Sequence, residues 1–183
     1  MVTYGMQAQD LRAEFQREYA ERRRRFHALL GALRGTDWRA PSRNPGWKNG
    51  EIATHIVFGF VLQLLLVPIV RLWSRLPRDS SKWFAWLLNA AIVPFNWLNA
   101  VGARAQSALA SPESLGRIMD RIMPRLSNMI GSLRPDDLGG GMYFPHCWDP
   151  VSFREYMTLA EVLRYPLTHF DFHVGQIVQR SAP

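Results

Sequence analysis

The stretch LRYPLTHFDFHVGQIVQR, from Leu163 to Arg180, places His169 and His173 four residues apart in a segment with helical apolar spacing. Residues at i and i+4 share one face of a helix, with Cβ atoms roughly 6 Å apart, so two imidazoles at this spacing can reach one metal ion. Tyr165 stands one turn before His169, and Gln176 stands just under one turn after His173. The spacing therefore predicts a polar stripe that carries two ligands of a metal site and needs a third.

A third imidazole stands in WKNGEIATHIVFGFVLQLLL, residues 47–66, which is expected to form another long helix. His55 lies there among apolar neighbours, with Glu51 one turn before it and Gly59 one turn after it. A lone histidine on an apolar face is more often a core residue than a ligand, and spacing alone leaves that alternative open. Three neutral imidazoles hold Zn²⁺, Ni²⁺ or Fe²⁺ on one side and leave positions for water or substrate, which is typical of catalytic sites. Phe170 stands where a His-Glu-x-x-His protease needs its glutamate, which argues against peptide hydrolysis.

Composition limits the class of protein. With 48% hydrophobic and 20% charged residues, the chain can bury the core of one domain, taken as residues 1–183. Cys147 is the only cysteine, and the first residues lack the pattern of a signal peptide, so a cytoplasmic location is expected. The net charge of +7 permits an acidic partner, but the arginines of the run 22–25 point in four directions on a helix. They predict a solvated face, and nucleic-acid binding is not expected.

Helical spacing and capping signals predict the other long helices. Apolar residues recur at steps of three and four from Ala8 to Leu33. The pair Ser111-Pro112 is typical of a helix start, and Thr158 with Glu161 forms a capping box that opens the last helix. Between these two helices, residues 134–153 are expected to form a long loop. It contains His146 and Cys147, which are expected on a pocket rim, with a metal-ligand or nucleophile role as the alternative.

The segments 56–70 and 83–103 carry no charged residue, so a membrane hairpin must be weighed. The first has 15 residues, fewer than the roughly 20 that a spanning helix needs, and the second contains three asparagines and a proline. We therefore expect a kinked helix, a turn near Pro77–Ser81, and an apolar helical insertion over residues 70–100. Contact of residues 56–103 with a membrane surface or an apolar partner stays open. The tryptophans expected to pack in the core or to line a pocket are Trp73, Trp83, Trp86 and Trp97.

The chain resembles the DinB-like superfamily of four-helix bundles in two stretches separated by a long middle. The first is a helix led by Trp47 that carries GEIATHI, and the second is MTLAEVLRYPLTHFDFHVGQI. The resemblance implies an all-α bundle of up-down-down-up type, with an extra Trp-rich insertion between helices two and three. It also implies a divalent metal held by one histidine of the second helix and a His-x-x-x-His pair of the last. The matching positions are His55, His169 and His173. The resemblance is weakest from Gly59 to Val101, where the insertion is longer than the family needs.

The superfamily includes thiol-dependent S-transferases and a thiol-dependent maleylpyruvate isomerase, which use mycothiol or bacillithiol. By resemblance, the metal would bind such a thiol, lower its pKa and present a thiolate to a small electrophile. Tyr165, Gln176 and Glu51 are expected to support the ligands or to contact the substrate, and the basic composition would suit an anionic thiol or an acid substrate. The alternative is a non-catalytic stress-response module whose insertion contacts a membrane, a lipid or a second copy. A homodimer is common among bundles of this size.

Overall fold

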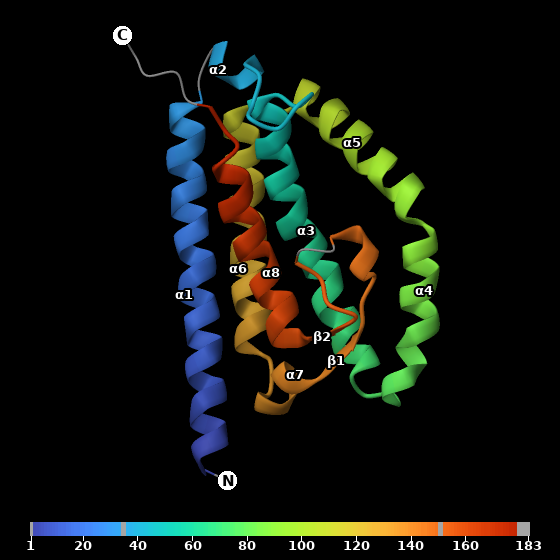
Figure 1. Cartoon of the computed structure of the whole chain (residues 1–183). Coiled ribbons are helices and arrows are strands. Elements are labelled where there is room, and N and C mark those ends of the chain that lie inside the picture. The colour runs from blue at the N-terminus through green and yellow to red at the C-terminus, as the bar shows by residue number, and fades with distance from the viewer. Residues whose placement is uncertain (1, 34–35, 150–151, 179–183) are drawn as a thin grey trace.

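Four long helices form a bundle (Figure 1). The structure, a computed structural model, describes residues 2–33, 36–149 and 152–178. The bundle helices are α1 (Val2–Ala32), α3 (Asn49–Trp73), α6 (Pro112–Gly131) and α8 (Leu159–Val174), and a short helix, α2 (Thr36–Arg39), follows α1. In Figure 1, α1 and α8 run upward while α3 and α6 run downward. The fold is therefore the expected all-α bundle of up-down-down-up type.

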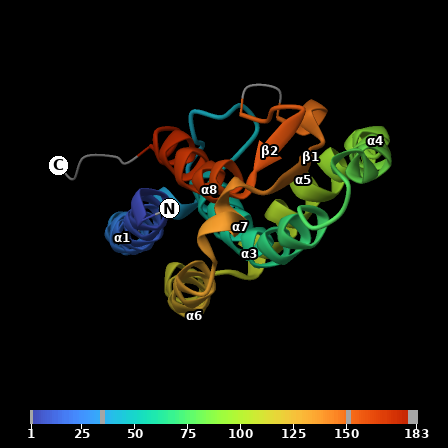
Figure 2. The ribbon, with the colours of Figure 1, turned by 90° about the horizontal axis from the view of Figure 1, so that it is seen from below.

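The segment between α3 and α6 is the return crossover that this topology requires. Because α3 and α6 run in the same direction, the chain must travel back along the bundle between them. It does so through η1 (Arg78–Ser81), α4 (Lys82–Ala90) and α5 (Ile92–Leu109). Helices of nine and 18 residues span roughly 40 Å at about 1.5 Å per residue, close to the length of α3. Seen from below, α4 lies at the edge of the molecule farthest from α1 (Figure 2).

The core lies among the four bundle helices. Among the described helices, α3 is the one that is long and apolar enough to cross a bilayer by length and composition. Its residues Ile56, Phe60 and Val67 are buried and belong to one cluster with side chains of α1, α6 and α8. About 33% of the most apolar stretch of α3 is buried in this way. The largest fully buried partners from the other helices are Phe15, Tyr19, Phe26, Met119, Leu126 and Phe170.

Three of the insertion's tryptophans contradict the expectation that they would be packed. Trp83, Trp86 and Trp97 are 59%, 71% and 64% exposed. Trp73 is half-buried and stacks on Phe84, with ring centroids 5.7 Å apart. The reason is topological, because α4 and α5 contact the rest of the protein on their inner side, and their outer side faces solvent.

The capping signals are confirmed at both helix starts. α6 begins directly after Ser111, whose side chain accepts a hydrogen bond from the Ser114 backbone N–H. α8 begins directly after Thr158, which exchanges hydrogen bonds with Glu161. These caps satisfy backbone donors that the first turn of a helix leaves without intrahelical partners. The start of α8 in turn sets which of its residues face α3.

The last helix is shorter than expected, since α8 ends at Val174 rather than continuing to Arg180. Gly175 follows, and the chain then turns through Gln176, whose backbone carbonyl accepts a hydrogen bond from the Arg43 N–H at 2.8 Å. This contact holds the chain against the loop that precedes α3. Residues 179 and 180 lie outside the described part of the chain.

The segment expected as a loop over residues 134–153 contains regular structure. It includes α7 (Pro135–Gly139), β1 (Gly141–Tyr143) and η2 (His146–Trp148), and β1 pairs antiparallel with β2 (Tyr156–Thr158). A Cβ on Gly141 would lie 2.3 Å from the Met157 carbonyl oxygen, so this close pairing requires glycine. Strands of three residues are too short to show an alternating pattern in the sequence.

The arginine run of α1 is more than the solvated face expected from its sequence. Arg22 and Arg25 both bind the Asp171 carboxylate of α8, at 2.7 and 2.6 Å, and Arg23 binds Asp120 of α6 at 2.7 Å. Partly exposed ion pairs contribute little stability individually. Asp171 stands between His169 and His173 in the sequence, so these pairs fix the outer side of the helix segment that carries both histidines.

Candidate metal centre

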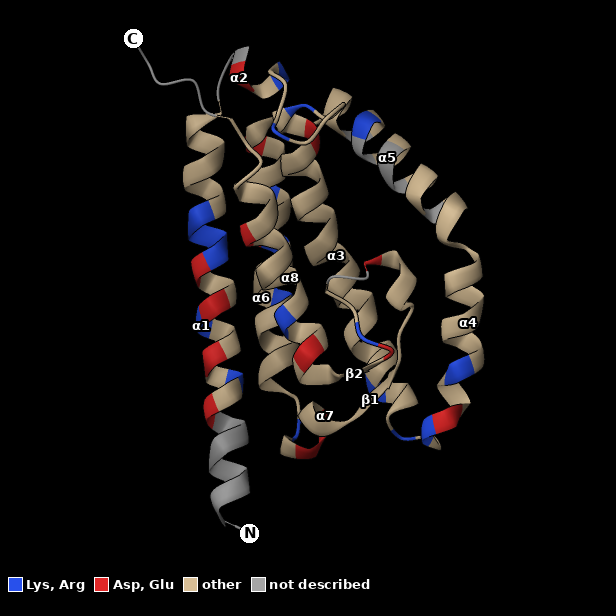
Figure 3. Ribbon diagram, viewed as in Figure 1, with Lys and Arg blue, Asp and Glu red and all other residues tan. Residues whose placement is uncertain are grey.

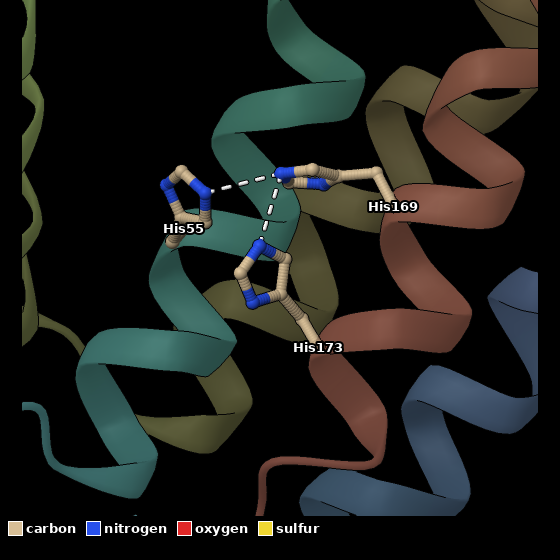
Figure 4. A group of neighbouring side chains, drawn as sticks. All are labelled: His55, His169 and His173. Carbon is tan, nitrogen blue, oxygen red and sulfur yellow. Dashed lines mark hydrogen bonds between the residues drawn. The ribbon is translucent and has the colours of Figure 1, made fainter. Parts of the chain in front are cut away.

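The rings of His55, His169 and His173 converge between α3 and α8 (Figure 4). The Nε2 atom of His169 lies 3.1 Å from Nε2 of His55 and 3.1 Å from Nε2 of His173. Two nitrogen donors that each bind one ion at about 2.1 Å are at most about 4.2 Å apart. Both distances meet this limit, and the ligand atoms of all three histidines lie within 4.8 Å of one another, so the three residues that the sequence proposed as ligands form a group that could hold a metal ion.

The backbone of α3 makes this approach possible. Gly59 lies one turn after His55, and a Cβ at this position would lie 3.4 Å from Nδ1 of His169. The His169 ring therefore lies directly against the α3 backbone.

A hydrogen bond orients the His173 ring. Its Nδ1 lies 2.8 Å from Oε1 of Gln176, so the ring N–H donates to the amide oxygen. The Nε2 atom then carries the lone pair that a metal ligand needs. The short contact between the His173 and His169 Nε2 atoms therefore needs either a proton on His169 or a cation between them. This donor set fits a divalent cation, and Gln176 has the supporting position that the stripe predicted.

Aromatic rings pack on each of the three imidazoles. Trp47 lies edge-on to His55 with centroids 5.6 Å apart, Tyr165 lies 5.3 Å from His169, and Phe172 lies 5.1 Å from His173. His173 is buried, while His55 and His169 are partly buried. The rings restrict the rotation of the imidazoles and hold the three nitrogens in position without a ligand.

Burial keeps the imidazoles neutral. Desolvation, with smaller contributions from His173 and His55, lowers the pKa of His169 to about 2. Desolvation also lowers the pKa of His173, although the hydrogen bond to Gln176 and the charge of Asp149 oppose this shift. Neutral imidazole is the form that binds metal, so both residues are ready to bind well below pH 7.

The shifted pKa of His169 predicts how the metal-free protein responds to acid. Below pH 6.5 the unfolded chain takes up a proton at His169, whereas the folded protein does so only near pH 2. The free energy of unfolding should therefore be unaffected by this group above pH 6.5 and fall by up to about 1.4 kcal/mol per pH unit below it. Urea denaturation at pH 7, 6 and 5 with a chelator present measures this slope. The variant His169→Gln should have a shallower slope, and equal slopes would contradict the prediction.

A cavity of about 310 Å³ adjoins the three imidazoles. Its walls come from α3, α5, α8 and the segment around η2, and most of them are apolar. None of the described residues that line it is a lysine or an arginine. The apolar wall includes Phe58, Leu62, Leu66, Trp148, Phe153 and Phe172, and the polar groups are Gln63, Asn96, Asp149 and Tyr165 beside the histidines.

Tyr165 and Asp149 form a polar pair in this cavity. The Asp149 carboxylate lies near the Tyr165 hydroxyl, and burial together with this carboxylate raises the pKa of the hydroxyl. Tyr165 was predicted as a site residue from its place on the histidine stripe. Asp149 was missed, because its position depends on the fold of the segment between β1 and β2. Its occurrence in a long loop beside His146 and Cys147 was the one signal available.

The other candidate residues lie around the site. Glu51 accepts a hydrogen bond from the Lys48 backbone N–H at 3.0 Å and thereby caps α3. It is not among the described residues that line the cavity. His146 and Cys147 are exposed, with Nε2 and Sγ 3.6 Å apart, and lie outside the three-histidine group. Their neighbours Trp148 and Asp149 line the cavity.

The chain was compared with models of protein families, with curated proteins and with solved structures. The family model described as the DinB superfamily matches residues 18–177. No curated protein and no solved structure matches the chain. The matched range includes the three histidines and Gln176.

Proposed function

Because the chain belongs to the DinB superfamily, we propose that it is a metal-dependent enzyme that joins a low-molecular-weight thiol to a small electrophile. His55, His169 and His173 would hold Zn²⁺, Ni²⁺ or Fe²⁺. The observation that carries the proposal is the convergence of three Nε2 atoms at the wall of a cavity. A divalent cation at this place supplies Lewis acidity that lowers the pKa of a thiol.

In the proposed transfer, the thiol gives up its proton to solvent, sulfur forms a bond to carbon, and the leaving group departs with its bonding electrons. An isomerisation would instead add the thiolate to a carbon–carbon double bond, allow rotation about the resulting single bond, and eliminate the same thiolate. Mycothiol and bacillithiol are the thiols that the resemblance to the superfamily favours. The histidines occupy one side of the cavity, the Tyr165–Asp149 pair offers polar contacts, and the aromatic wall excludes water from the reacting groups.

The cavity favours an uncharged, largely apolar electrophile. The described lining residues include the Asp149 carboxylate and no lysine or arginine. An anionic substrate would meet this carboxylate, and the compensating positive charge in the proposed site would be that of the metal, which the bound thiolate already partly neutralises. Several of the basic residues that raise the net charge are engaged elsewhere, as Arg22, Arg23 and Arg25 are in ion pairs of α1. The basic composition thus gives no support for an acid substrate at this site.

Two measurements on protein purified without a nickel column test the proposed function. Elemental analysis should find about one divalent metal ion per chain. Consumption of mycothiol or bacillithiol in the presence of an uncharged haloalkyl or epoxide electrophile should require the metal and should stop after chelation. If the protein bound metal but consumed no thiol with any of these electrophiles, it would be a metal-binding module, and the enzymatic proposal would be contradicted.

Gln176→Leu should weaken metal binding about 10- to 100-fold, because it removes the acceptor that orients Nδ1 of His173. Competition with a chromogenic chelator measures this change in affinity. Leucine is similar in size to glutamine, so the variant removes the hydrogen bond with little change in packing.

The matched control is Gln16→Leu. The Gln16 amide likewise makes a hydrogen bond, donating to the Ser127 carbonyl oxygen at 2.9 Å, but it lies between α1 and α6. Its loss should leave metal affinity unchanged. Equal affinities for the two variants would show that Gln176 does not support the His173 ligand.

A further inference from the structure

The outer side of α4 and α5 carries an apolar stripe. Its members recur at steps of one, three and four within α4 and from Val93 to Val101 of α5, which places each group along one side of its helix, and a last member follows at the end of α5. They are 39% to 91% exposed. We call these residues the outer stripe: Trp83, Trp86, Leu87, Val93, Trp97, Leu98, Val101 and Leu109.

The polarity of these helices is inverted relative to that of an ordinary surface helix. Asn89 faces inward and accepts a hydrogen bond from the Cys147 backbone N–H at 3.2 Å, and Asn96 lines the cavity beside the histidines. The large apolar side chains face solvent instead. Contiguous exposed apolar surface of this kind marks an interaction site in soluble proteins.

The charges around the outer stripe are mainly basic, although Asp79 of η1 forms an ion pair with Lys82 at 3.0 Å. The sequence contains no aspartate or glutamate from Ser80 to Pro112. Lys82 stands four residues before Trp86, and Arg104 stands seven after Trp97, so helical spacing places a cation near each end of the stripe. In Figure 3, the described parts of α4 and α5 are mostly tan, with blue and red side by side at the lower end of α4 and blue near the upper end of α5.

We propose that the outer stripe binds the surface of a lipid bilayer that contains anionic lipids. Tryptophan is enriched at the interface between the hydrocarbon and headgroup regions, and helices with an apolar face and flanking cations lie in that interface. Arg75 and Arg104 are exposed near the two ends of the crossover and are placed to contact lipid phosphates. The crossover lies at the edge of the molecule away from α1, so a flat surface can approach it (Figure 2).

The same charges argue against a second copy of the chain as the occupant. A two-fold contact would place the outer stripe against itself. The cations at its ends would then meet a surface whose helices contribute no carboxylate. An anionic bilayer supplies the missing negative charge. Binding to a lipid surface also requires no protein surface of complementary shape.

Sedimentation of the full chain with vesicles tests this proposal, and it is done in a chelator so that the result is independent of the metal site. The protein should bind vesicles of phosphatidylcholine with phosphatidylglycerol and should bind phosphatidylcholine alone more than tenfold less well. The double variant R75Q/R104Q should bind the anionic vesicles about thirtyfold less tightly, since each cation near the surface contributes to binding. The double variant W86S/W97S should lose binding and the blue shift of tryptophan fluorescence that accompanies it.

The control is Ile118→Ser, which changes a residue of α6 that is 38% exposed and lies outside the outer stripe. It should bind like the wild type. The arginine variant keeps the test valid if the tryptophan variant fails to fold, because both arginines are exposed. Equal binding to neutral and anionic vesicles, or no binding by the wild type, would overturn the proposal. The wild type could instead form a dimer in sedimentation equilibrium and fail to bind vesicles, while W86S/W97S is a monomer. That result would assign the stripe to a second copy and would also overturn the proposal.

Discussion

Replacing His173 by alanine is expected to abolish metal binding. The variant should lower metal affinity more than 100-fold, beyond the range seen when a residue supporting a ligand is lost. Two imidazoles would remain, with Nε2 atoms 3.1 Å apart. Gln176 would also lose its partner on the ring. Elemental analysis of the purified variant, together with titration of metal into the chelated protein, measures the loss.

The controls are histidines outside the cluster. His146→Ala removes an exposed histidine beside Cys147, and His27→Ala removes one that bonds Asp120 at 2.8 Å. Both variants should keep the metal content of the wild type. If His173→Ala also kept it, the assignment of the three-histidine group as a metal site would fail. Circular dichroism should show that all three variants retain their helices.

Phe170→Ala is expected to have the largest effect on stability. The Phe170 ring is fully buried, and it packs against Phe60 and Phe26 at centroid distances of 6.2 and 6.5 Å. Truncating a buried phenylalanine costs about 3–5 kcal/mol, because it removes apolar contacts and leaves a cavity. For a domain of this size, this loss lowers Tm by roughly 8–16 °C. Urea denaturation gives the free energy, and calorimetry gives Tm.

Phe172→Ala is the matched control for this prediction. Phe172 stands two residues further along α8 and is 64% exposed. Its truncation should change the free energy of unfolding by less than about 0.5 kcal/mol. The pair thus compares the same substitution on two sides of one helix. If Phe170→Ala lowered the free energy of unfolding as little as Phe172→Ala, the α8 face carrying Phe170 would not form the core.

The parts of the site that were predictable depend on local spacing. His169 and His173 stand on one helix face wherever α8 forms, and Thr158 with Glu161 marks where α8 begins. His55 lies 114 residues before His169, and no local pattern links the two. Its inclusion depended on the resemblance to a family whose helices pack in a known order. The helix starts were predictable because capping is a property of a few consecutive residues.

The parts that were missed depend on contacts between distant segments. Asp149 reaches the cavity because β1 and β2 pair and hold the segment between them in place. The exposure of Trp86 and Trp97 follows from which side of the crossover meets the bundle, and composition alone favoured burying them. The pairing of Arg22 and Arg25 with Asp171 requires α1 to lie beside α8. These arrangements are tertiary, so helical spacing carries no sign of them.

The inner and outer residues of the return crossover are under different constraints. Its length is set by the bundle, and its inner residues Ala85 and Asn89 meet the rest of the protein. Its outer residues contribute little to the folded state, so most substitutions there have small effects on stability. Substitutions on this side of the protein can therefore create, remove or exchange a binding surface without disturbing the bundle or the three histidines.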